Sequence, residues 1–466
     1  MPTTLSAACV PEDVLDVCKR LQGAGWQAHL VGGGVRDLLL GRVPADFDVA
    51  TNARPEVVMQ LFGARYALPT GLAHGTVTVL AGRPARPVEV TTFRGEGAYL
   101  DGRRPSSVSF SATLDEDLSR RDFTMNAIAF DPLADLVTDP FEGRGDLGRK
   151  VVRAVGDPGT RFTEDGLRPM RAVRQATQLG FVIEPATLDA IEPTLPSFRR
   201  VSAERVRDEL FKMLAAPVPS GGVRLMARTG LLQDVLPELA ACRGLAQEPF
   251  HALDVFEHAL ATLDSLPPEP TLRLSGLLHD VGKGLGPESS ASGGPPFASH
   301  AAAGAAIVGK VAERLRLSSA ERRLLCDLVG GHEFDDAPGQ SDAQLRGLLR
   351  RWVAAPEGLA RVAGHLALYQ ANRNARHAPA HRDEAAAAFV ARLHALVATA
   401  PPLSAKDLAV DGRVLMQELA LPPGKHVGQL LERLLERVLE DPSLNTRPRL
   451  LDEARALRTP VAPVGP

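Results

Sequence analysis

The chain has 466 residues, of which 44% are hydrophobic and 23% charged, and its formal net charge is −3. This length is too great for one ordinary core and is typical of about three domains. No apolar run approaches the roughly 18 residues of a membrane span, and the start lacks the features of a signal peptide, so we expect a cytoplasmic protein without membrane contact. The four cysteines show no CxxC spacing, which excludes a zinc–cysteine cluster and a disulfide framework.

The net charge alone does not point to nucleic acid. Residues 144–224, however, carry 14 Lys and Arg against 10 Asp and Glu, and most of the basic residues are Arg, whose planar fork suits phosphates and base edges. A genome rich in Arg codons would produce the same bias. Charge therefore leaves both explanations open.

The predicted elements fall into two parts. Apolar periodicity predicts an alternation of helices and strands in the first part, with helices at 11–21 and 55–62 and strands at 27–31, 46–50, 76–80 and 88–92. Beyond about residue 150 strand patterns nearly vanish and helical spacing continues to about residue 457. We therefore expect an α+β fold: a small N-terminal head with a mixed sheet and helices, followed by a long all-helical body.

A glycine turn and two aspartates mark the first part of the chain. The predicted strand at 27–31 runs into Gly32-Gly33-Gly34, and Val35-Arg36-Asp37 then opens a helix. Glycines let the backbone approach a ligand closely, and a helix N-terminus directs free N–H groups at an anion. On the next strand, Asp46 and Asp48 have the i, i+2 spacing that places both carboxylates on one face. Such a pair repels itself unless a divalent cation such as Mg²⁺ lies between the carboxylates.

The turn G-G-x-V-R-D followed by D-x-D resembles the signature of the DNA polymerase β-like nucleotidyltransferases. It is similar to their class II branch, which contains the bacterial CCA-adding enzymes and poly(A) polymerases. The resemblance implies catalytic, Mg²⁺-binding roles for Asp46 and Asp48, with Glu89 of VEVTTFR as a third strand carboxylate. It also implies that the nucleotide is bound by residues of the turn, namely Gly32, Gly33, Arg36 and Asp37.

Further motifs of this branch follow in order over roughly the first 215 residues. Arg103-Arg104-Pro105 resembles its flexible loop, and Arg121, Asp122 and Asn126 of RRDFTMNA resemble residues that contact ribose and triphosphate. The segment EDGLR resembles its nucleobase-reading helix, with Asp165, Arg168, Arg171 and Arg174 as nucleotide-binding residues. The segment 204–210 resembles the supporting helix that follows.

The base-reading role has a physical rationale. A helix capped by Thr163 would place Asp165 and Arg168, at i and i+3, on one face. A fixed carboxylate accepts from the amino group of cytosine or adenine while a fixed guanidinium donates to the adjacent ring acceptor. Uracil and guanine present the reverse order and leave buried groups unpaired, which costs about 1–3 kcal/mol each. Pro169 interrupts this predicted helix and makes the position of Arg171 relative to Arg168 uncertain.

A second group of residues resembles the HD-family phosphohydrolases. His279-Asp280 in LLHDVGKG matches the signature pair, and His258, His300 and His332 flank it. The resemblance implies a second divalent metal, Mg, Mn or Ni, that supplies hydroxide for phosphoester hydrolysis. The expected last ligand is an aspartate, but the best match is Asn372, an uncharged and poorer ligand. The alternative is a domain kept only as a structural body.

The resemblance implies addition of C, C and A to the 3′ end of tRNA from CTP and ATP, with release of pyrophosphate. Its partner would be tRNA, held at the acceptor arm and elbow. The predicted domains are a nucleotidyltransferase head, a neck with the base-reading helices, an HD-type domain and a helical tRNA-binding tail, at 1–147, 148–245, 246–375 and 376–466.

Four alternatives stay open. Poly(A) polymerases share the head, but commonly lack an HD domain and end in a basic extension, whereas this chain ends in RALRTPVAPVGP. A CC-only or A-only adding enzyme has the same chemistry, and the loop around Arg103 favours full addition. An HD phosphohydrolase with a degenerate head, or a non-catalytic RNA-binding protein, would not need both aspartates. The sequence does not determine the oligomeric state.

Overall fold

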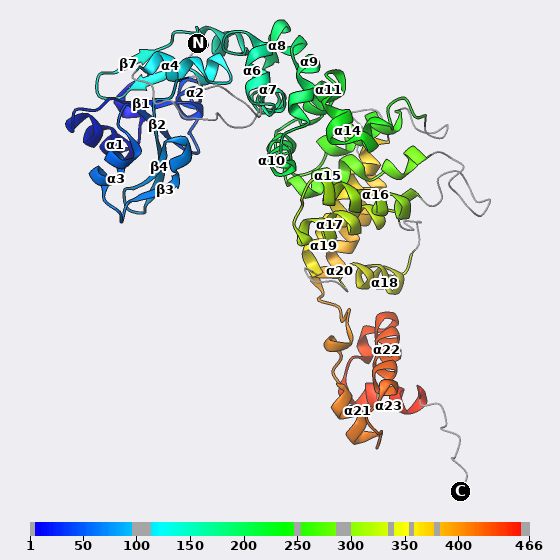
Figure 1. The fold of residues 1–466 in the computed structure, drawn as a ribbon. Helices are drawn as coiled ribbons and strands as arrows, with labels where there is room; N and C mark the ends of the chain where they lie inside the picture. Colours follow the sequence, from blue (N-terminus) through cyan, green and yellow to red (C-terminus); the bar gives the residue numbers. More distant parts are fainter. Residues whose placement is uncertain are drawn as a thin grey trace. The chain divides into compact units, whose positions relative to one another are not determined.

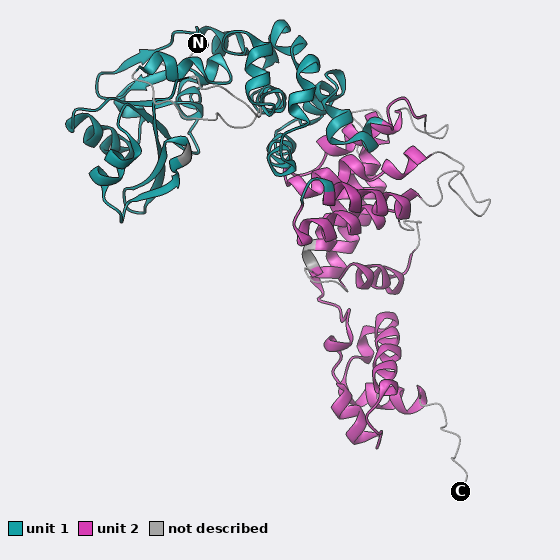
Figure 2. Ribbon diagram, viewed as in Figure 1, with its two compact units in different colours: residues 1–240, 314–316 teal, residues 241–313, 317–466 magenta. Residues whose placement is uncertain are grey.

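The computed structural model describes residues 5–95, 113–246, 253–285, 300–333, 340–353, 358–376 and 383–457. It divides into two compact units, residues 1–240 with 314–316, and residues 241–313 with 317–466 (Figure 2). Arg103 and Arg104, assigned to the flexible loop, lie outside the described residues. Among the described helices, none is long and apolar enough to cross a membrane.

A mixed seven-stranded sheet forms the core of the N-terminal part of unit 1 (Figure 1). Its order is β3-β4-β5-β2-β1-β6-β7, and β2 and β5 are parallel while the other neighbours are antiparallel. The strands are β1 Ala28–Val31, β2 Asp48–Thr51, β3 Ala67–Gly71, β4 Thr76–Ala81, β5 Arg86–Thr92, β6 Ala129–Asp131 and β7 Leu136–Thr138.

Strand β4, and strand β5 from residue 87 onward, alternate between buried and less buried residues. In β5, Val88 and Val90 are buried while Glu89 between them is exposed, and Val77 and Val79 of β4 are buried in the same way. Successive side chains of a strand point to opposite faces. Helices α1 and α3, residues Glu12–Gly23 and Pro55–Phe62, lie against β4, so the valines form a core with them and Glu89 points to the other face.

The rest of unit 1 is mainly helical and carries the neck. A short parallel pair, β8 Val151–Val152 with β9 Val182–Ile183, is its one further described sheet. The helices besides α1 and α3 are α2 Gly33–Leu39, α4 Leu114–Ser119, α5 Gly143–Arg149, α6 Pro158–Glu164, α7 Arg168–Leu179, α8 Pro185–Asp189, α9 Ile191–Phe198, α10 Ala203–Leu214, α11 Ser220–Arg228, α12 Leu231–Val235 and α13 Pro237–Ala240.

The described residues of unit 2 contain helices and no strand. A large apolar cluster joins α18, α19 and α20 to the C-terminal helices, with Leu349, Leu393, Leu434 and Leu450 fully buried in it. The helices are α14 Val255–Asp264, α15 Pro270–Leu278, α16 His300–Arg314, α17 Ser319–Gly330, α18 Asp342–Val353, α19 Gly358–Ala375, α20 Glu384–Ala398, α21 Gly412–Glu418, α22 Lys425–Glu440 and α23 Arg447–Leu457.

The predicted fold class is confirmed, since a mixed sheet occupies the head and helices dominate the body. The predicted helix at 55–62 is α3, and the predicted strands at 27–31, 76–80 and 88–92 match β1, β4 and β5 within two residues at each end. Strands β3, β6 and β7 were not predicted. The division into four predicted domains stays a prediction.

Two adjacent glycines of α11 provide a test of neck packing. A Cβ at Gly222 would lie 2.5 Å from Oγ1 of Thr177 and 2.6 Å from Sδ of Met213, whereas a Cβ at Gly221 would meet nothing within 4 Å. Gly222→Ala should therefore destabilise unit 1 by about 1–3 kcal/mol, because packed neighbours must shift. Gly221→Ala should stabilise it by about 0.5–1 kcal/mol, because alanine is the better helix former. Urea unfolding measures both, and equal stabilities of the two variants would contradict this packing.

Candidate active site

Three carboxylates gather near the start of strand β2 and the middle of strand β5. Asp48 begins β2 and is paired directly with Glu89 of β5 in the parallel register, so both side chains project from the same face. Asp46 precedes β2 by two residues, and Phe47 between the two aspartates is buried. The predicted strand at 46–50 thus begins two residues late, but the alternation around Phe47 is retained.

The glycine turn lies directly against this carboxylate group. Gly32 has a φ of +73° and precedes α2, and a Cβ there would lie 3.1 Å from Oδ2 of Asp48. A Cβ at Gly34 would lie 3.1 Å from the backbone carbonyl of Asp46. Only glycine combines the positive φ at residue 32 with this close approach. The turn therefore brings the backbone next to Asp48.

The carboxylates act on each other electrostatically. Burial raises the pKa of Asp48, the charges of Asp46 and Glu89 also raise it, and Arg121 opposes them; together they bring this pKa to about 6 from its ordinary value of 3.8. The chain thus supplies less positive charge than this group of acids requires. Hard oxygen ligands with unbalanced negative charge fit a divalent cation such as Mg²⁺.

Asp117 is a site residue that the sequence analysis missed. It is 1% exposed and pairs with both Arg120 and Arg121, at 3.0 Å for the latter. Burial alone would raise the pKa of Asp117, but the two guanidinium groups outweigh it and lower that pKa. Arg121 in turn lies against the glycine turn, since its Nη1 is 3.3 Å from the Cβ position of Gly32. Asp117 therefore holds an arginine whose charge counters that of Asp48.

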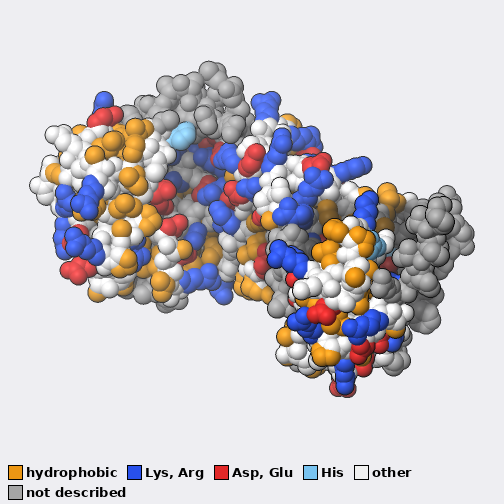
Figure 3. All heavy atoms as spheres, turned by 90° about the horizontal axis from the view of Figure 1, so that it is seen from below, with side chains coloured by type: hydrophobic (Ala, Val, Ile, Leu, Met, Phe, Trp, Pro, Cys, Tyr) orange, Lys and Arg blue, Asp and Glu red, His pale blue; other side chains and the backbone are white. Residues whose placement is uncertain are grey.

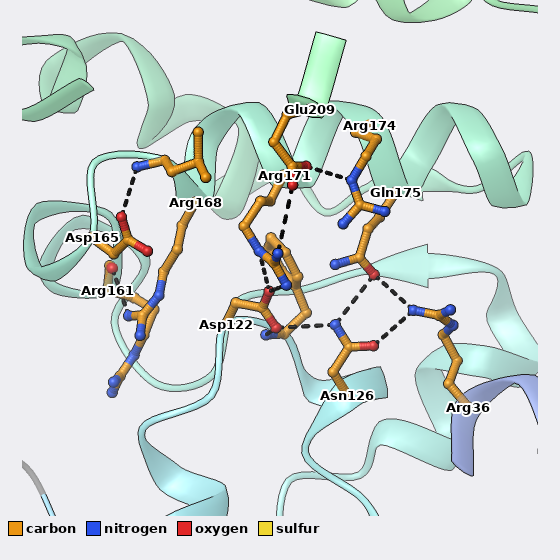
Figure 4. A network of polar contacts seen from close by, with 12 residues as sticks. Arg36, Asp122, Asn126, Arg161, Asp165, Arg168, Arg171, Arg174, Gln175 and Glu209 are labelled. Atoms are coloured by element: carbon orange, nitrogen blue, oxygen red, sulfur yellow. Dashed lines mark hydrogen bonds and ion pairs between the residues drawn. The ribbon is translucent and has the colours of Figure 1, made fainter. Parts of the chain in front are cut away.

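A buried polar network links the glycine-turn helix to the neck (Figure 4). Arg36 of α2 donates to Oδ1 of Asn126 at 3.0 Å and to Oε1 of Gln175 at 3.2 Å. Asn126 donates to Oδ1 of Asp122 at 3.0 Å and to Oε1 of Gln175 at 3.2 Å. Asp37 accepts from Nε of Arg36 at 2.9 Å. Gln175 of α7, which is 1% exposed, was not predicted as a site residue.

The network continues into the neck through two arginines of α7. Arg171 pairs with Oδ2 of Asp122 at 2.6 Å, and Arg174 pairs with Glu209 of α10 and with Gln178 (Figure 4). Burial alone would raise the pKa of Asp122, but Arg171 and Asn126 lower it below its ordinary value. The charge of Asp122 raises the pKa of Arg171 above its ordinary value. Both of these arginines, which were predicted to bind the nucleotide, thus have carboxylate partners.

The prediction of one helix starting at Thr163 is wrong. Thr163 lies in α6, which ends at Glu164, and Asp165 has extended backbone angles before α7 begins at Arg168. Asp165 and Arg168 therefore do not share a helix face through i, i+3 spacing. The physical reason is Pro169, which occupies the first turn of α7, where its missing N–H is tolerated. The expected distortion of a helix interior accordingly does not arise.

Asp165 and Arg168 are held in fixed orientations by other residues (Figure 4). Oδ2 of Asp165 accepts from Arg205 of α10 at 2.8 Å, and its Oδ1 accepts from the backbone N–H of Leu167. Arg168, which is 8% exposed, pairs with Glu164 at 2.7 Å and donates to the backbone carbonyls of residues 120 and 161. Three of its donors are used in this way. The two side chains are thus anchored separately.

In unit 2, the structure brings together all five residues predicted for the HD site. His279 and Asp280 follow α15, His258 lies in α14, His300 begins α16 and His332 follows α17. All five are at most 5% exposed. They form two groups of potential metal ligands that share Asp280: one contains His258 and His279, and the other contains His300 and His332.

The chemistry of this cluster fits a divalent metal. Nδ1 of His279 lies 2.8 Å from the carbonyl of Gly276 and Nδ1 of His332 lies 2.7 Å from that of Val329, which leaves Nε2 of each ring facing Asp280. Such second bonds orient the rings of metal ligands. Burial lowers the pKa of His332, so the ring is neutral and keeps a lone pair. Nε2 of His279 is buried and makes no hydrogen bond to any described residue.

The fold and these sites define a nucleotidyltransferase head joined to an HD domain. Residues 28–153 match the poly A polymerase head domain, and residues 250–363 match the HD domain. Residues 180–243 match the "Probable RNA and SrmB- binding site of polymerase A", and residues 366–454 match domain 2 of tRNA nucleotidyltransferases. Four family models thus match successive segments between residues 28 and 454, and they describe domains of poly(A) polymerases, tRNA nucleotidyltransferases and HD proteins.

Named relatives are CCA-adding enzymes. The enzyme of Geobacillus stearothermophilus is 45% identical over 229 residues, which are 49% of this chain and 55% of that enzyme; that of Lactobacillus helveticus is 46% identical over 50% and 57%. The similarity thus spans about half the length of these relatives. The crystal structure of the Bacillus stearothermophilus CCA-adding enzyme with CTP is 29% identical, covers 96% of both chains and has a TM-score of 0.68. The Thermotoga maritima enzyme complexed with tRNA, at 19% identity and a TM-score of 0.59 over 96% of each chain, shares the fold.

The raised pKa of Asp48 predicts a stabilising substitution. Between its ordinary pKa of 3.8 and its folded value of about 6, the folded state binds more protons than the unfolded chain, so this group makes stability fall as the pH rises through that range. At about pH 7.5 without divalent ions, Asp48→Asn should therefore stabilise unit 1 by about 1–3 kcal/mol, with little effect at about pH 4. The measurement is thermal unfolding in a chelator.

Glu89→Gln is the graded control, because its carboxylate is exposed and its charge is better solvated. It should stabilise the metal-free protein less than Asp48→Asn does. Added Mg²⁺ should raise the melting temperature of the wild type more than that of Asp48→Asn. If Asp48→Asn raised the free energy of unfolding equally at both pH values, ionisation of Asp48 would not destabilise the folded state, and the prediction would be wrong.

Proposed function

We propose that this protein adds C, C and A to the 3′ end of tRNA from CTP and ATP and releases pyrophosphate with each addition. The observation that carries the proposal is the carboxylate group of Asp46, Asp48 and Glu89 against the glycine turn. The named relatives, which this chain matches over 55% and 57% of their lengths, are CCA-adding enzymes. One structure that matches 96% of this chain is a CCA-adding enzyme in complex with CTP. A cytoplasmic location remains part of this proposal.

The reaction joins the 3′ oxygen of the RNA to the α-phosphorus of the nucleotide, and the bond from that phosphorus to the pyrophosphate oxygen breaks. Asp46 and Asp48 would hold Mg²⁺, with Glu89 beside them. Bound divalent ions supply charge stabilisation for the entering and leaving oxygens. Gly32 leaves the space that a triphosphate needs next to Asp48. Arg36, Asp37, Arg121, Asp122 and Asn126 would bind the nucleotide, and no side chain needs to act as a nucleophile.

Selection of C and A requires polar groups that do not move. We assign it to Asp165 and Arg168, because each is anchored by its own partners, Arg205 for the first and Glu164 for the second. Preorganised groups reject a mismatched base because they cannot rotate to form other hydrogen bonds and would stay unpaired. Arg171 and Arg174 are proposed to contribute to nucleotide binding while paired with Asp122 and Glu209.

The tRNA would be bound by the neck and the C-terminal helices, within the four-part division predicted from the sequence. Its acceptor arm and elbow are long and uniformly charged, but the face drawn in Figure 3 intersperses basic and acidic side chains. Recognition would therefore depend on local arginine contacts to phosphates rather than on one extended positive field. In the HD cluster, we propose that the imidazoles and Asp280 bind a divalent transition metal such as Mn or Ni.

Addition to defined RNA ends tests the proposed function. Transcripts of tRNA that end before CC, before the second C or before A are incubated with each labelled nucleotide. The expected result is completion to CCA followed by a stop, and Asp46→Ala should reduce incorporation at least about 10³-fold, because charge stabilisation at the phosphoryl group is lost. Asp280→Ala, in the HD cluster, is the control and should leave addition intact. Long poly(A) on unstructured RNA would instead identify a poly(A) polymerase.

Asp165→Ala should relax the choice of nucleotide. Loss of the carboxylate removes the acceptor for the amino groups of C and A, so UTP incorporation relative to CTP should rise about tenfold or more, in line with about 1–3 kcal/mol per unpaired group. Asp234→Ala is the matched control, because Asp234 is also paired with a neck arginine, Arg199, at 2.9 Å. The ratio of kcat/KM values for the two nucleotides is measured. An unchanged ratio in Asp165→Ala would remove this residue from base reading.

A further inference from the structure

The two halves of the HD cluster differ in charge and geometry, and we infer that only one of them holds a metal ion. The site would take one divalent transition metal on Asp280, His300 and His332, with Glu333 as an additional ligand. His258 and His279 would stay outside its coordination shell. The inference rests on metal binding by this cluster, as proposed above, and is independent of the reaction proposed for the head.

Asp280 divides the cluster through its two oxygens. Its Oδ1 lies 3.0 Å from Nε2 of His300 and 3.5 Å from Nε2 of His332. Its Oδ2 lies 3.3 Å from Nε2 of His279 and 3.8 Å from Nε2 of His258. Each oxygen could therefore serve a different metal position. The surroundings of the two oxygens decide which position is favourable.

The half around Oδ1 has the dimensions of one coordination shell. Nε2 of His300 and Nε2 of His332 lie 3.2 Å apart, and both are within 3.5 Å of Oδ1. Ligand atoms about 2.1 Å from one metal lie about 3.0–3.4 Å apart in octahedral or tetrahedral geometry. Without a metal, two imidazole nitrogens at 3.2 Å repel each other unless one of them donates its proton to the other. A metal ion bound to both lone pairs would remove this repulsion.

Glu333 adds charge to this half. Its Oε1 lies 3.6 Å from Nε2 of His300, and its side chain is 51% exposed, so the carboxylate can reach the cluster without being buried in it. With Asp280 it would supply two negative charges to one divalent ion. The sequence analysis did not predict Glu333, which directly follows His332 in the chain.

The half around Oδ2 already contains a cation. Nζ of Lys283 lies 2.7 Å from Oδ2 of Asp280, which is the oxygen that a metal in this half would need. An ammonium ion on that oxygen neutralises it and repels a second cation in a buried site, where such repulsion is poorly screened. Lys283 thus neutralises Oδ2 of Asp280, as a metal ion in this half would otherwise do.

Asn372 opposes a metal in the same half. Its Oδ1 lies 3.0 Å from Nε2 of His258, and an amide oxygen can only accept, so this nitrogen carries the ring proton and has no lone pair for a metal. The neutral amide also brings none of the charge that a carboxylate would contribute. Asn372 and Lys283 therefore engage two of the groups that a metal in this half would need, Nε2 of His258 and Oδ2 of Asp280.

Metal stoichiometry tests the inference on the full-length protein. Asp46→Asn/Asp48→Asn serves as the background, so that ions bound at the head are not counted. Equilibrium dialysis against Ni²⁺ or Co²⁺ should give one ion per chain. His300→Gln should lower the affinity at least about 100-fold, while His258→Gln should change it less than threefold, because only the first removes a ligand. Glu333→Gln should weaken binding about tenfold.

A second measurement first counts the ions in the background protein, in which every residue of the HD cluster is unchanged. Electron paramagnetic resonance of the Mn²⁺-loaded background protein should show the hyperfine pattern of isolated ions. Asn372→Asp combined with Lys283→Gln should raise the stoichiometry to two and give exchange-coupled spectra, because the second half regains a carboxylate and loses its cation. Two ions per chain before these changes, or loss of the ion in His258→Gln with retention in His300→Gln, would overturn the inference. Absence of any bound ion would overturn the proposed HD metal site as well.

Discussion

The repulsion among the carboxylates of Asp46, Asp48 and Glu89, near the start of β2 and the middle of β5, is the constraint on which the rest of the head depends. Burial of Val49, Val88 and Val90 forces Asp48 and Glu89 onto the same face, because strand residues alternate. The core thus buries Asp48 beside like charges, and burial together with the charges of Asp46 and Glu89 raises its pKa. Among the described residues Arg121 opposes this charge, and Asp117 already shares that arginine. Binding of a cation would therefore relieve the repulsion among the carboxylates of the folded head. The glycine turn leaves the space next to Asp48 open.

The polar network of unit 1 explains how the neck can be placed accurately with respect to the glycine turn. A buried donor or acceptor without a partner costs about 1–3 kcal/mol, so Arg36, Asn126, Gln175 and Asp122 tolerate few alternative arrangements. Gln175 contributes one oxygen that accepts from both Arg36 and Asn126, and Asp122 extends the chain of contacts to Arg171. Since α7 also carries Arg168, the position of this residue, which is proposed to read the base, is linked to that of the glycine turn. The proposed contacts to phosphate and base would therefore be positioned together.

Local patterns predicted the head, whereas tertiary contacts decided the details that the sequence could not give. The D-x-D spacing and the glycine turn are short-range signals, and they identified Asp46, Asp48 and Gly32 as neighbours, which the structure confirms. The predicted helix start at Thr163 is wrong. Threonine is a favourable N-cap residue, but Pro169 is best accommodated in the first turn of a helix, and α7 accordingly begins at Arg168. Gln175 and Asp117 carry no motif, and only their burial next to arginines reveals them. Strands β6 and β7 have three residues each, too few for alternation to be recognised.

The two centres differ in the kind of ion that each can select. The head offers carboxylate oxygens and an excess of negative charge, which suits Mg²⁺, an ion that keeps water and phosphate ligands. The HD cluster offers four imidazoles around one carboxylate, and burial keeps the His332 ring neutral, which suits transition metals. Affinity for a transition metal at the HD cluster would therefore not deplete the ions that the head needs. Lys283 and Asn372 act in the same direction, because they exclude a second ion that would have to bind through the weaker half. The different ligands of the two centres would thus be sufficient for one chain to bind Mg²⁺ at the head and a transition metal at the HD cluster.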